Sequence, residues 1–556
     1  MASHLRILIV GGVAGGASCA ARARRLSESA VITMFDRGPY VSFANCGLPY
    51  YVGNVIKREE NLLVATPELF RKRFNIDVRL RSEVLRIDPA GRRIEVRDLE
   101  TGTLYHESYD ALVLSPGARP IKPPIPGIDM PGIFSLRTIP DSRQIRAWID
   151  QYQARRAAVI GGGYIGMEIT ENLIKRGLKV SLIEKQNQVM PLLDPEMMPE
   201  VHETLLRNGI DLFLNTSVER IDPGAGHQLQ LKLTSGDTVE TDLVILCIGV
   251  RPETSLAREA NLSIGTSGGI QVDSHMRTSD AHIWAVGDAV EVHDTVTGLK
   301  NVIPLAGPAN RQGRIAADTI MGRSSTFRGV QGTSVVAIVD RVVAFTGPSE
   351  KLLRRIGRWE HMEKIYLHPG HHAGYYPGAS PITFKLIFEK KNGRVVSAQA
   401  VGKSGIEKRI DVVAMAIQKG ATVFDLEEAE LCYAPQFGSA KDPVNLAGMI
   451  AANVLRGDAH LAHWEAAEAT GALILDVRDP SEFQRDHLEG AVNLPLDEIR
   501  GRISELPKER EIWTYCYVGQ RSYYAARTLS QHGFDVKNIS GGFKSYLLHE
   551  AIKDMK

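Results

Sequence analysis

The sequence has few cysteines for its length, and they are widely separated. The 556-residue chain contains five, namely Cys19, Cys46, Cys247, Cys432 and Cys516. This spacing matches neither a disulfide framework nor the short Cys pairs of zinc sites. Adjacent histidines at 371 and 372 without further ligands indicate a loop, so we expect no metal site. We expect a cytoplasmic protein with reduced thiols.

The chain also lacks an excess of one charge and any long apolar run. Its 66 Lys and Arg residues face 65 Asp and Glu residues, so we expect no electrostatic binding of nucleic acid or of an acidic membrane. No apolar run approaches the roughly 18 residues that a membrane span needs. The short run 7–10 and the small residues up to Cys19 resemble a secretion signal, but glycines interrupt the run. Small molecules are the expected partners.

Two segments about 150 residues apart share one strand, glycine turn, helix and strand pattern. In the first, the four parts are 5–10, 11–16, 17–26 and 31–36, and in the second they are 157–160, 161–166, 167–176 and 179–184. Each apolar run is typical of a buried parallel strand. The pattern predicts two Rossmann-like βαβ units and therefore two bound nucleotides.

The second glycine turn meets the G-x-G-x-x-G pattern in full. Its expected cofactor contacts are Gly161, Gly163, Tyr164, Ile165 and Gly166. Glycines allow close approach of the backbone to a pyrophosphate, and the helix N-terminus favours its charge. Glu184 ends the next strand, where it can accept from a ribose 2′-hydroxyl and repel the extra phosphate of NADP. We therefore expect NADH, while Lys185 leaves NADPH possible.

The first glycine turn departs from that pattern, because Val13 stands where the middle glycine belongs. Two carboxylates support it nevertheless. Asp36 ends the following strand, and Asp288 follows a strand in the segment TSDAHIWAVGDAV at 278–290. Asp36 can bind an adenosine ribose and Asp288 a ribityl chain. Together they suggest FAD, with turn contacts at Gly11, Gly12, Val13, Ala14 and Gly15.

Changes of pattern along the chain predict its domains. Strands that run into Gly/Pro turns at 111–120 and 242–252 indicate crossings between domains. From about residue 333 antiparallel strands appear, with a hairpin signal at Lys391-Asn392-Gly393, and a last α/β pattern starts at 473. The expected parts are 1–115 (FAD-binding, first part), 116–242 (NAD(H)-binding), 243–325 (FAD-binding, second part), 326–450 (dimerisation), 451–465 (linker) and 466–556 (rhodanese-like).

Cys46 has no neighbour with which it could form a redox disulfide. A Cys-x-x-x-x-Cys reductase has its second cysteine five residues away, and here those positions hold Tyr51 and Val41. One thiol must therefore work alone. It can form a mixed disulfide with an outside thiol or a sulfenic acid with peroxide.

Five motifs in order resemble the coenzyme A disulfide reductases. They are the first glycine turn, SFANCGLPYY at 42–51, the second glycine turn, AVGDA at 285–289 and YAPQFGSAKD at 433–442. With its appended domain the chain is most similar to the rhodanese-fused branch, which includes NADH-dependent persulfide reductases. The resemblance implies an α/β fold with two Rossmann-like domains, an α+β dimerisation domain and a C-terminal rhodanese-like domain. It also implies a homodimer whose active site is shared between subunits.

The resemblance further implies individual site residues. Tyr376, or its neighbour Tyr375, and Tyr433 would meet the cysteine of the other subunit, and Tyr164 would cover the flavin. Coenzyme A contacts would fall on Ser18, Arg22, Arg25, Ser42, Asn45, Asn310 and Lys441, where Arg22 and Asn310 are not the family's usual residue types. Further cofactor contacts are expected at Arg37, Asn45, Pro116, Gly117, Gly249, Pro304, Leu305 and Ala306, the last ones before a helix at 307–314.

The C-terminal segment is similar to rhodanese domains. It carries Asp476-Val477-Arg478, EGAVNLP at 489–495 and the six-residue loop Cys516-Tyr517-Val518-Gly519-Gln520-Arg521. Backbone N–H groups of such a loop converge on the cysteine and stabilise a persulfide anion, and Arg521 adds positive charge. We expect Cys516 to carry sulfane sulfur.

The sequence therefore predicts an FAD-dependent NAD(P)H:sulfur reductase. Its expected substrates are coenzyme A persulfide, polysulfide or coenzyme A disulfide, with Cys46, Tyr376, Tyr433, Cys516 and Arg521 as catalytic residues. Coenzyme A would be a substrate or a bound thiol. Two alternatives stay open, namely an NADH oxidase or peroxidase that cycles Cys46 as sulfenic acid, and a sulfurtransferase with a redox-sensing flavin module.

Overall fold

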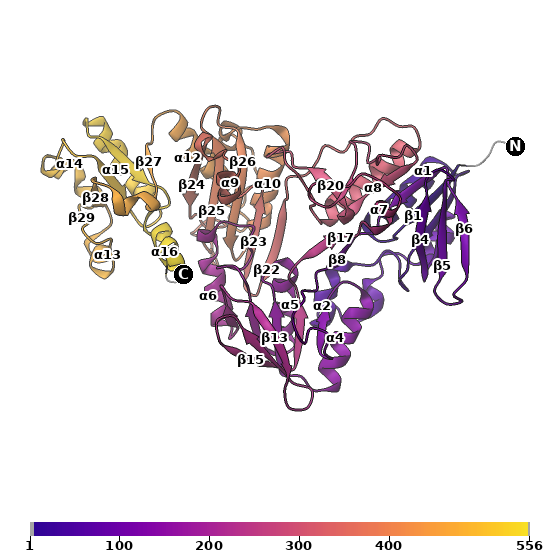
Figure 1. Ribbon diagram of the computed structural model, residues 1–556. Coiled ribbons are helices and arrows are strands. Elements are labelled where there is room, and N and C mark those ends of the chain that lie inside the picture. The colour runs from indigo at the N-terminus through magenta and orange to yellow at the C-terminus, as the bar shows by residue number, and fades with distance from the viewer. Residues whose placement is uncertain (1–4, 554–556) are drawn as a thin grey trace. The chain divides into compact units, whose positions relative to one another are not determined.

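The computed structural model describes residues 5–553, which form two compact units (Figure 1). The first unit consists of the chain up to Lys185 together with Asn215–Gly332. The second consists of Gln186–Leu214 and the chain from Thr333 onward. We describe each unit by itself. The domain boundaries expected from the sequence stay predictions.

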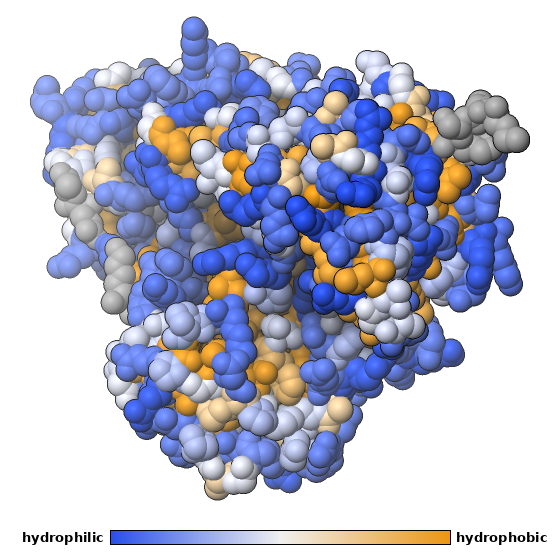
Figure 2. Space-filling model, turned by 45° about the vertical axis from the view of Figure 1, so that its right-hand side comes forward, coloured by the Kyte–Doolittle hydropathy of each residue, from blue (hydrophilic) through white to orange (hydrophobic). Residues whose placement is uncertain are grey.

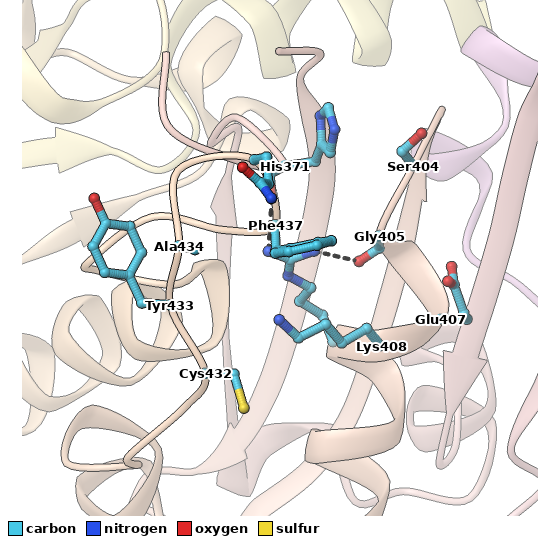
Figure 3. A pocket seen from close by; sticks show the side chains of 11 residues that line it. His371, Ser404, Gly405, Glu407, Lys408, Cys432, Tyr433, Ala434 and Phe437 are labelled. Carbon is cyan, nitrogen blue, oxygen red and sulfur yellow. Dashed lines mark hydrogen bonds between the residues drawn. The ribbon is translucent and has the colours of Figure 1, made fainter. Parts of the chain in front are cut away.

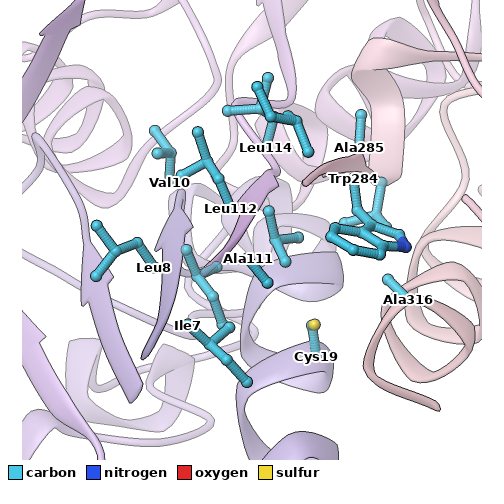
Figure 4. Close-up of a cluster of buried hydrophobic side chains, with 14 of the residues drawn as sticks. Ile7, Leu8, Val10, Cys19, Ala111, Leu112, Leu114, Trp284, Ala285 and Ala316 are labelled. Carbon is cyan, nitrogen blue, oxygen red and sulfur yellow. The ribbon is translucent and has the colours of Figure 1, made fainter. Parts of the chain in front are cut away.

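The first βαβ segment builds a parallel sheet in the first unit. The strands follow the order β19-β7-β1-β2-β3 and pair in parallel. Their bounds are β1 (Arg6–Val10), β2 (Val31–Phe35), β3 (Asp77–Arg79), β7 (Ala111–Leu114) and β19 (Ile283–Ala285). Figure 4 shows the apolar side chains of β1, β7 and β19 packing with Cys19 of α1 (Ala14–Leu26) and Ala316 of α8 (Ala306–Ile320). Complete burial raises the pKa of the Cys19 thiol to about 12, so it is a core residue.

The second βαβ segment builds an equivalent parallel sheet. Its strands run in the order β11-β10-β16-β9. The elements are β9 (Ile133–Ser135), β10 (Arg156–Ile160), α5 (Tyr164–Lys175), β11 (Lys179–Ile183) and β16 (Leu243–Leu246). Both helices begin three residues earlier than expected, inside the glycine turns. The start of each helix packs closely against the first glycine of its turn. A Cβ on Gly16 or on Gly166 would lie 1.9 Å from the carbonyl oxygen of that glycine, so only glycine allows the helical backbone to begin there.

Smaller sheets and helices complete the first unit. The crossing strands β8 (Ala118–Pro120) and β17 (Val250–Pro252) pair with each other. Two antiparallel sheets contain β4 (Ser82–Asp88), β5 (Arg93–Asp98) and β6 (Leu104–Ser108), and β13 (Val218–Pro223), β14 (Leu229–Leu233) and β15 (Thr238–Thr241). A mixed sheet contains β18 (Ile270–Gln271), β20 (Val290–His293) and β21 (Lys300–Asn301), with β18 parallel and β21 antiparallel to β20. The other helices are α2 (Leu48–Val52), α3 (Pro67–Phe74), α4 (Ile139–Gln151) and α7 (Ser255–Glu259).

The second unit contains an antiparallel sheet and a parallel one. The antiparallel sheet, in the order β22-β23-β26-β25-β24, includes the predicted hairpin of β25 and β26, which is confirmed. Its strands are β22 (Ser334–Ile338), β23 (Arg341–Thr346), β24 (Met362–Leu367), β25 (Ile382–Glu389) and β26 (Val395–Gly402). Outside this sheet, the second unit contains β12 (Asp211–Phe213), α6 (Pro199–Arg207), α9 (Glu350–Arg355), α10 (Ile406–Lys419), α11 (Val423–Glu427) and α12 (Pro443–Leu455).

The parallel sheet of the second unit belongs to the C-terminal α/β part. Its order is β27-β31-β30-β28-β29. The elements are β27 (Leu461–Ala462), β28 (Leu473–Asp476), α13 (Pro480–Arg485), β29 (Val492–Asn493), α14 (Ile499–Arg502), β30 (Ile512–Tyr515), α15 (Gln520–Gln531), β31 (Val536–Ile539) and α16 (Gly542–Lys553). Separate apolar clusters fill the two faces of this sheet. The expected mixed α/β architecture is confirmed.

Buried charges join the antiparallel sheet to the C-terminal part. Lys385 of β25 is fully buried, and its Nζ lies 2.9 Å from Asp194 Oδ2, 2.5 Å from Glu196 Oε1 and 2.7 Å from Glu350 Oε2. Lys364 Nζ, from β24, lies 3.0 Å from Glu350 Oε2 and 2.5 Å from Glu465 Oε1, in the short helical segment that follows β27. Oxygens of the first three carboxylates lie within 4.8 Å of one another, which would suit a cation, and the Lys385 ammonium takes that place.

A buried histidine makes the second unit sensitive to acid. His202 of α6 accepts a hydrogen bond from the Val189 N–H at 3.2 Å and is 1% exposed, and burial lowers its pKa from 6.5 to about 4. A depressed pKa means that stability is complete above pH 6.5 and is lost as pH falls toward 4, by up to about 3 kcal/mol. His202→Gln should therefore flatten the loss of melting temperature between pH 7 and pH 4. His361→Gln, at an exposed position, should not. An unchanged pH slope in His202→Gln would contradict this assignment.

The described surface is mainly hydrophilic on the face drawn in Figure 2, with small hydrophobic patches between charged side chains. Among residues 5–553, no helix has the length and apolar character needed to cross a membrane.

Candidate active site

The first glycine turn is held by Asp36. Its Oδ2 accepts a hydrogen bond from the Gly12 N–H at 3.1 Å, and its Oδ1 accepts from the Gly38 N–H at 2.8 Å. Burial raises the pKa of Asp36, although these N–H groups act against that rise. Gly11 has a φ of 96°, and a Cβ there would lie 2.1 Å from the Ser115 oxygen. The turn thus brings bare backbone and one carboxylate to the N-terminus of α1, as a dinucleotide requires.

The predicted ribityl-binding carboxylate lies in a second glycine-containing turn of the same sheet. Asp288 follows Gly287, whose φ is 82° and whose N–H donates to Gln312 Oε1 at 2.7 Å. Burial raises the pKa of Asp288, and Arg137 opposes the rise. Gln312 comes from α8, which begins at Ala306, one residue before the expected start at 307. Sequence reasoning missed Gln312 and Arg137, because both act from distant parts of the chain.

These features fit FAD. The bare turn, Asp36 and Asp288 lie on one sheet and supply the groups that its pyrophosphate and hydroxyls need. Pro116 and Gly117, with a φ of 73°, continue the edge at which β7 ends, and Gly249 has a φ of 109° in the equivalent position after β16. Asn45 Oδ1 is buried and has no hydrogen-bond partner among the residues that the structure describes. Its neighbour is Cys46, so an acceptor next to the thiol is free for a bound group.

The second glycine turn repeats the arrangement of the first. Glu184 Oε2 accepts from the Gly162 N–H at 2.7 Å, and Gly161 has a φ of 105°. A Cβ on Gly161 would lie 2.5 Å from the Cys247 oxygen. Ile165, at the start of α5, is 39% exposed. The carboxylate, the turn and the helix N-terminus are therefore arranged for a second nucleotide, while burial raises the pKa of the Cys247 thiol to about 12 and leaves it inert.

Cys46 is exposed and lies in a single helical turn, Asn45–Gly47, that leads into α2. Partial burial of the sulfur raises the pKa of Cys46, and the carboxylates of Glu168 and Asp288 add to the rise. The two positions where a partner cysteine would stand, Tyr51 and Val41, are both buried. Arg137 acts against the rise in pKa, but on balance the surroundings of Cys46 within this unit disfavour the thiolate.

Tyr50 and Glu168 form an unpredicted pair close to this thiol. The Tyr50 hydroxyl donates to Glu168 Oε1 at 3.2 Å. The pKa of Tyr50 is raised to about 12, chiefly by burial and also by the nearby Glu168 and Cys46. Burial likewise raises the pKa of Glu168. The sequence holds no signal for this pair, because Glu168 belongs to α5 of the other glycine turn.

The predicted coenzyme A contacts in the first unit are partly engaged with each other. The Ser18 hydroxyl donates to Asn310 Oδ1 at 2.5 Å, which joins α1 to α8. Arg22 Nε donates to Asp318 Oδ1 at 2.7 Å, so this guanidinium is already neutralised. Arg25 is exposed, and Ser42 is buried with a φ of 47°. The cation available on this helix face is therefore Arg25, and a role of Arg22 in binding phosphate stays a prediction.

Exposed tyrosines gather on the antiparallel part of the second unit. The hydroxyls of Tyr375 and Tyr433 lie 2.7 Å apart, and these side chains are 76% and 48% exposed. Tyr376, the residue expected from the sequence, makes an edge contact with the ring of His372 instead. A role for Tyr376 stays a prediction, but the structure pairs its neighbour Tyr375 with Tyr433.

A pocket of about 490 Å³ adjoins Tyr433 in the second unit (Figure 3). Cys432, Phe437, Lys408 and His371 contribute to its lining. Arg409 braces the wall by donating to the Gly405 and His371 oxygens at 2.9 and 2.7 Å. Lys441 is exposed on the segment that follows. The tyrosines and the pocket thus form one open surface that another molecule can cover.

The loop around Cys516 connects β30 to α15. Cys516 is 1% exposed, and its Sγ accepts from the Gly519 N–H at 3.2 Å and from the Ser522 hydroxyl at 3.6 Å. Gly519 has a φ of 93°, which turns its N–H toward the sulfur. Arg521 donates to Glu482 through both Nη atoms, at 2.6 and 2.8 Å. Of the backbone N–H groups expected to converge on the cysteine, that of Gly519 donates to the sulfur, and the Arg521 charge is balanced by a residue that the sequence did not indicate.

Comparison with known families agrees with this geometry. Residues 5–313 match the model of the pyridine nucleotide-disulphide oxidoreductases, and 333–442 match the dimerisation domain of the same family. The chain belongs to this family. Residues 461–549 match the rhodanese-like domain. The oxidoreductase family accounts for the two glycine turns, because its members use FAD and NAD(P)H, and the rhodanese match accounts for the Cys516 loop.

Relatives within the oxidoreductase family handle sulfur. The coenzyme A disulfide reductase of Staphylococcus epidermidis is 36% identical over 444 residues, which are 80% of this chain and 99% of that protein. The reduced CoADR-RHD of Bacillus anthracis matches with a TM-score of 0.96 and 46% identity over 100% of this chain and 99% of that one. The NAD-dependent persulfide reductase from A. fulgidus matches with a TM-score of 0.90 and 35% identity, over 98% and 100%.

One solved structure of an enzyme named for a different reaction matches only part of this chain. The water-forming NADH oxidase from Lactobacillus brevis has a TM-score of 0.77 and 28% identity over 82% of this chain and 99% of that one. The expected membership in the sulfur-reducing branch of the family, with an appended rhodanese domain, is confirmed by the full-length matches.

Proposed function

We propose that the protein is an NADH-dependent reductase of coenzyme A persulfide, polysulfide or coenzyme A disulfide. The observation that carries this proposal is the exposed thiol of Cys46, which has no cysteine beside it and lies in the unit that contains the FAD-type sheet, in a chain that also carries the Cys516 loop. A lone thiol suits mixed-disulfide chemistry, and the second loop supplies a place for sulfane sulfur. The sulfur-reducing relatives support the same assignment.

The reaction at Cys46 is thiol–disulfide exchange. The Cys46 thiolate attacks the coenzyme A sulfur of the disulfide or persulfide, and a coenzyme A thiolate or hydrosulfide leaves. Cys46 then holds coenzyme A in a mixed disulfide. FAD, when bound, supplies the two electrons of NADH that reduce this disulfide to the two thiols. Asp36 and Asp288 would hold that cofactor, and Asn45 offers its free acceptor to the bound group beside the sulfur.

The proton balance at Cys46 calls for an outside group. Partial burial and nearby carboxylates raise the pKa of this thiol, so its own unit disfavours the thiolate. We place the chain in a homodimer in which Tyr375 and Tyr433 of one subunit reach the Cys46 site of the other. Their paired hydroxyls can stabilise a thiolate and protonate the leaving sulfur. The dimerisation-domain match and the open tyrosine surface support this arrangement.

The dinucleotide is proposed to be NADH because of Glu184. Glu184→Gln keeps an acceptor for the Gly162 N–H but removes the negative charge that opposes a 2′-phosphate. The ratio of kcat/KM for NADPH over NADH should rise about tenfold, which corresponds to about 1.4 kcal/mol. Glu259→Gln, which removes an exposed carboxylate of the same unit, should leave the ratio unchanged. An unaltered ratio in Glu184→Gln would remove Glu184 as the determinant.

A peroxide- or oxygen-reducing enzyme is the second candidate, favoured by the lone cysteine and by the likeness to the NADH oxidase. A panel of substrates separates the two. NADH consumption by the holoenzyme is measured anaerobically with coenzyme A persulfide, coenzyme A disulfide, polysulfide and peroxide. We expect kcat/KM for a sulfur substrate to exceed that for peroxide by at least about 100-fold. A preference for peroxide, or turnover with oxygen alone, would overturn the sulfur reductase.

A further inference from the structure

We propose that the Cys516 loop takes sulfur from the persulfide of a small organic thiol and discriminates against thiosulfate. The inference rests on the proposed role of Cys516 as a sulfur carrier, but it does not depend on the reductase activity of the flavin part. It follows from how charge is balanced around the loop.

The loop itself carries almost no charge. Between Cys516 and Arg521 stand Tyr517, Val518, Gly519 and Gln520, all of them neutral. The Gly519 N–H and the Ser522 hydroxyl are the donors that reach the sulfur, at 3.2 and 3.6 Å. Neutral donors stabilise one negative charge on a persulfide, but they give little additional attraction to a dianion.

Acidic side chains neutralise the one cation of the loop. Arg521 forms a bidentate salt bridge with Glu482, with N–O distances of 2.6 and 2.8 Å. Asp479 Oδ2 lies 3.5 Å from Arg521 Nη1. The Asp479 N–H donates to Glu482 Oε2 at 3.3 Å, so the N-terminus of α13 fixes the acceptor in place. The arginine is about one-third exposed and the glutamate less. Counting +1 for Arg521 and −1 for each carboxylate, the three side chains together carry −1.

Basic residues on neighbouring segments are also paired. Arg478 donates to the buried Asp476 through Nε to Oδ1 at 3.0 Å and through Nη2 to Oδ2 at 2.6 Å. Lys544, whose N–H donates to the Tyr517 oxygen, has its Nζ 3.1 Å from Glu200 Oε1. These cations hold the fold together, and an incoming anion would have to compete with their carboxylates.

Thiosulfate is a dianion, and it must release sulfite, a second anion, when its outer sulfur is taken. An organic persulfide carries at most one charge at the reacting group. The Cys516 thiolate attacks the terminal sulfur of R–S–SH, the S–S bond breaks, and R–S⁻ leaves and binds the proton. Cys516 becomes a persulfide, and no outside oxidant or reductant is needed.

Aromatic side chains at the loop suit the organic part of such a donor. Tyr517 and Tyr524 are 44% and 48% exposed, and Gln520 Nε2 donates to the Tyr524 hydroxyl at 2.9 Å. The exposed rings offer apolar contact area with hydrogen-bonding ends. Together with the balanced charge, this surface favours an organic thiol persulfide over an inorganic dianion.

The test measures sulfur transfer to Cys516 in the full-length holoenzyme. Cys46→Ser protein is mixed anaerobically, without NADH, with equal concentrations of glutathione persulfide or thiosulfate, and mass spectrometry of the Cys516 peptide follows persulfide formation. We expect the organic donor to react at least about 100-fold faster, and Cys516→Ser protein to form no persulfide at this peptide. Rates that agree within about threefold, or faster transfer from thiosulfate, would overturn the proposal.

Two variants test the charge argument directly. Gln520→Lys adds a cation to the loop, and Glu482→Gln frees the charge of Arg521. Each should raise the thiosulfate rate about tenfold at low salt, with the gain shrinking at high salt, and should change the organic donor by less than about threefold. Glu505→Gln removes a carboxylate of the same domain that pairs with Arg502, and should change neither rate. Equal gains for both donors would overturn the charge argument. Because the assay needs no NADH, loss of reductase activity cannot be mistaken for its failure.

Discussion

Cys46→Ser is expected to lower kcat/KM for persulfide and disulfide reduction by at least about 10³-fold. The other thiols of the first unit, Cys19 and Cys247, cannot replace it, because burial raises the pKa of each to about 12. The substitution leaves both nucleotide-binding turns intact, together with the carboxylates of Asp36 and Glu184 that accept from them. Electron transfer from NADH to an artificial dye should therefore remain within about twofold of wild type.

The control for this variant is the other exposed thiol. Cys432→Ser changes a residue of the pocket beside Tyr433 and should keep sulfur turnover within about threefold of wild type. If Cys46→Ser retained full persulfide turnover, the sulfur chemistry would not occur at this cysteine. If Cys46→Ser also lost dye reduction, the loss would reflect damage to the cofactor site.

Lys385→Met is expected to destabilise the second unit by about 3–5 kcal/mol. The substitution leaves Asp194, Glu196 and Glu350 close together without the ammonium that lies within 2.9 Å of each. In the native unit this lysine is one of the charges that lower the pKa of Glu350 to about 2. Stability from Glu350 is therefore complete above its ordinary pKa and is lost as pH falls from about 4.5 to 2. Without Lys385 the carboxylates hold protons at higher pH, so the difference between variant and wild type should shrink toward pH 4.

Hydrogen exchange of peptides from β25 measures this effect locally, since a chain of several domains need not unfold in one step. Lys403→Met is the matched control, because Lys403 pairs with Asp340 at the surface with 53% of its side chain exposed. That variant should change protection by less than about 0.5 kcal/mol. A Lys385→Met protein as stable as the control at pH 7 would show that the buried ion network contributes nothing.

Local sequence patterns predicted the two nucleotide folds well. Apolar runs and glycine turns were enough to place β1, β2, β10 and β11 to within one residue, because each pattern reflects contacts between neighbours in the chain. The starts of α1 and α5 were placed three residues late. Glycine in a sequence usually indicates a turn, but in both segments the helix already begins among the glycines, where the backbone packs too closely for a Cβ.

Long-range pairs in the candidate site could not be predicted. Glu168 reaches Tyr50, Asp318 reaches Arg22 and Glu482 reaches Arg521 across large sequence separations. Nothing in the residues around one partner marks the other. The sequence favours Tyr376 with Tyr375 as its alternative, and the pattern alone does not fix which of the two meets Tyr433, because neighbouring residues of a loop point in different directions.

Cys46 and Cys516 lie in different surroundings, and these surroundings suit different steps of sulfur chemistry. Cys46 is exposed and lies near carboxylates that raise its pKa, so its reaction depends on bound groups and on outside hydrogen-bond donors that stabilise the thiolate. Cys516 is almost fully buried and receives the Gly519 N–H, as a site that stores sulfur requires. The first arrangement suits exchange with a substrate, and the second suits protection of a persulfide.

Trapping the substrate on Cys46 tests the central claim most directly. Wild-type holoenzyme, with its thiols reduced and excess reductant removed, is mixed anaerobically with coenzyme A disulfide in the absence of NADH, and its peptides are mapped by mass spectrometry. We predict release of one coenzyme A thiol per subunit and a coenzyme A adduct on the Cys46 peptide, which added NADH then removes. An adduct confined to Cys432 or Cys516, or equal thiol release by Cys46→Ser protein, would contradict the account.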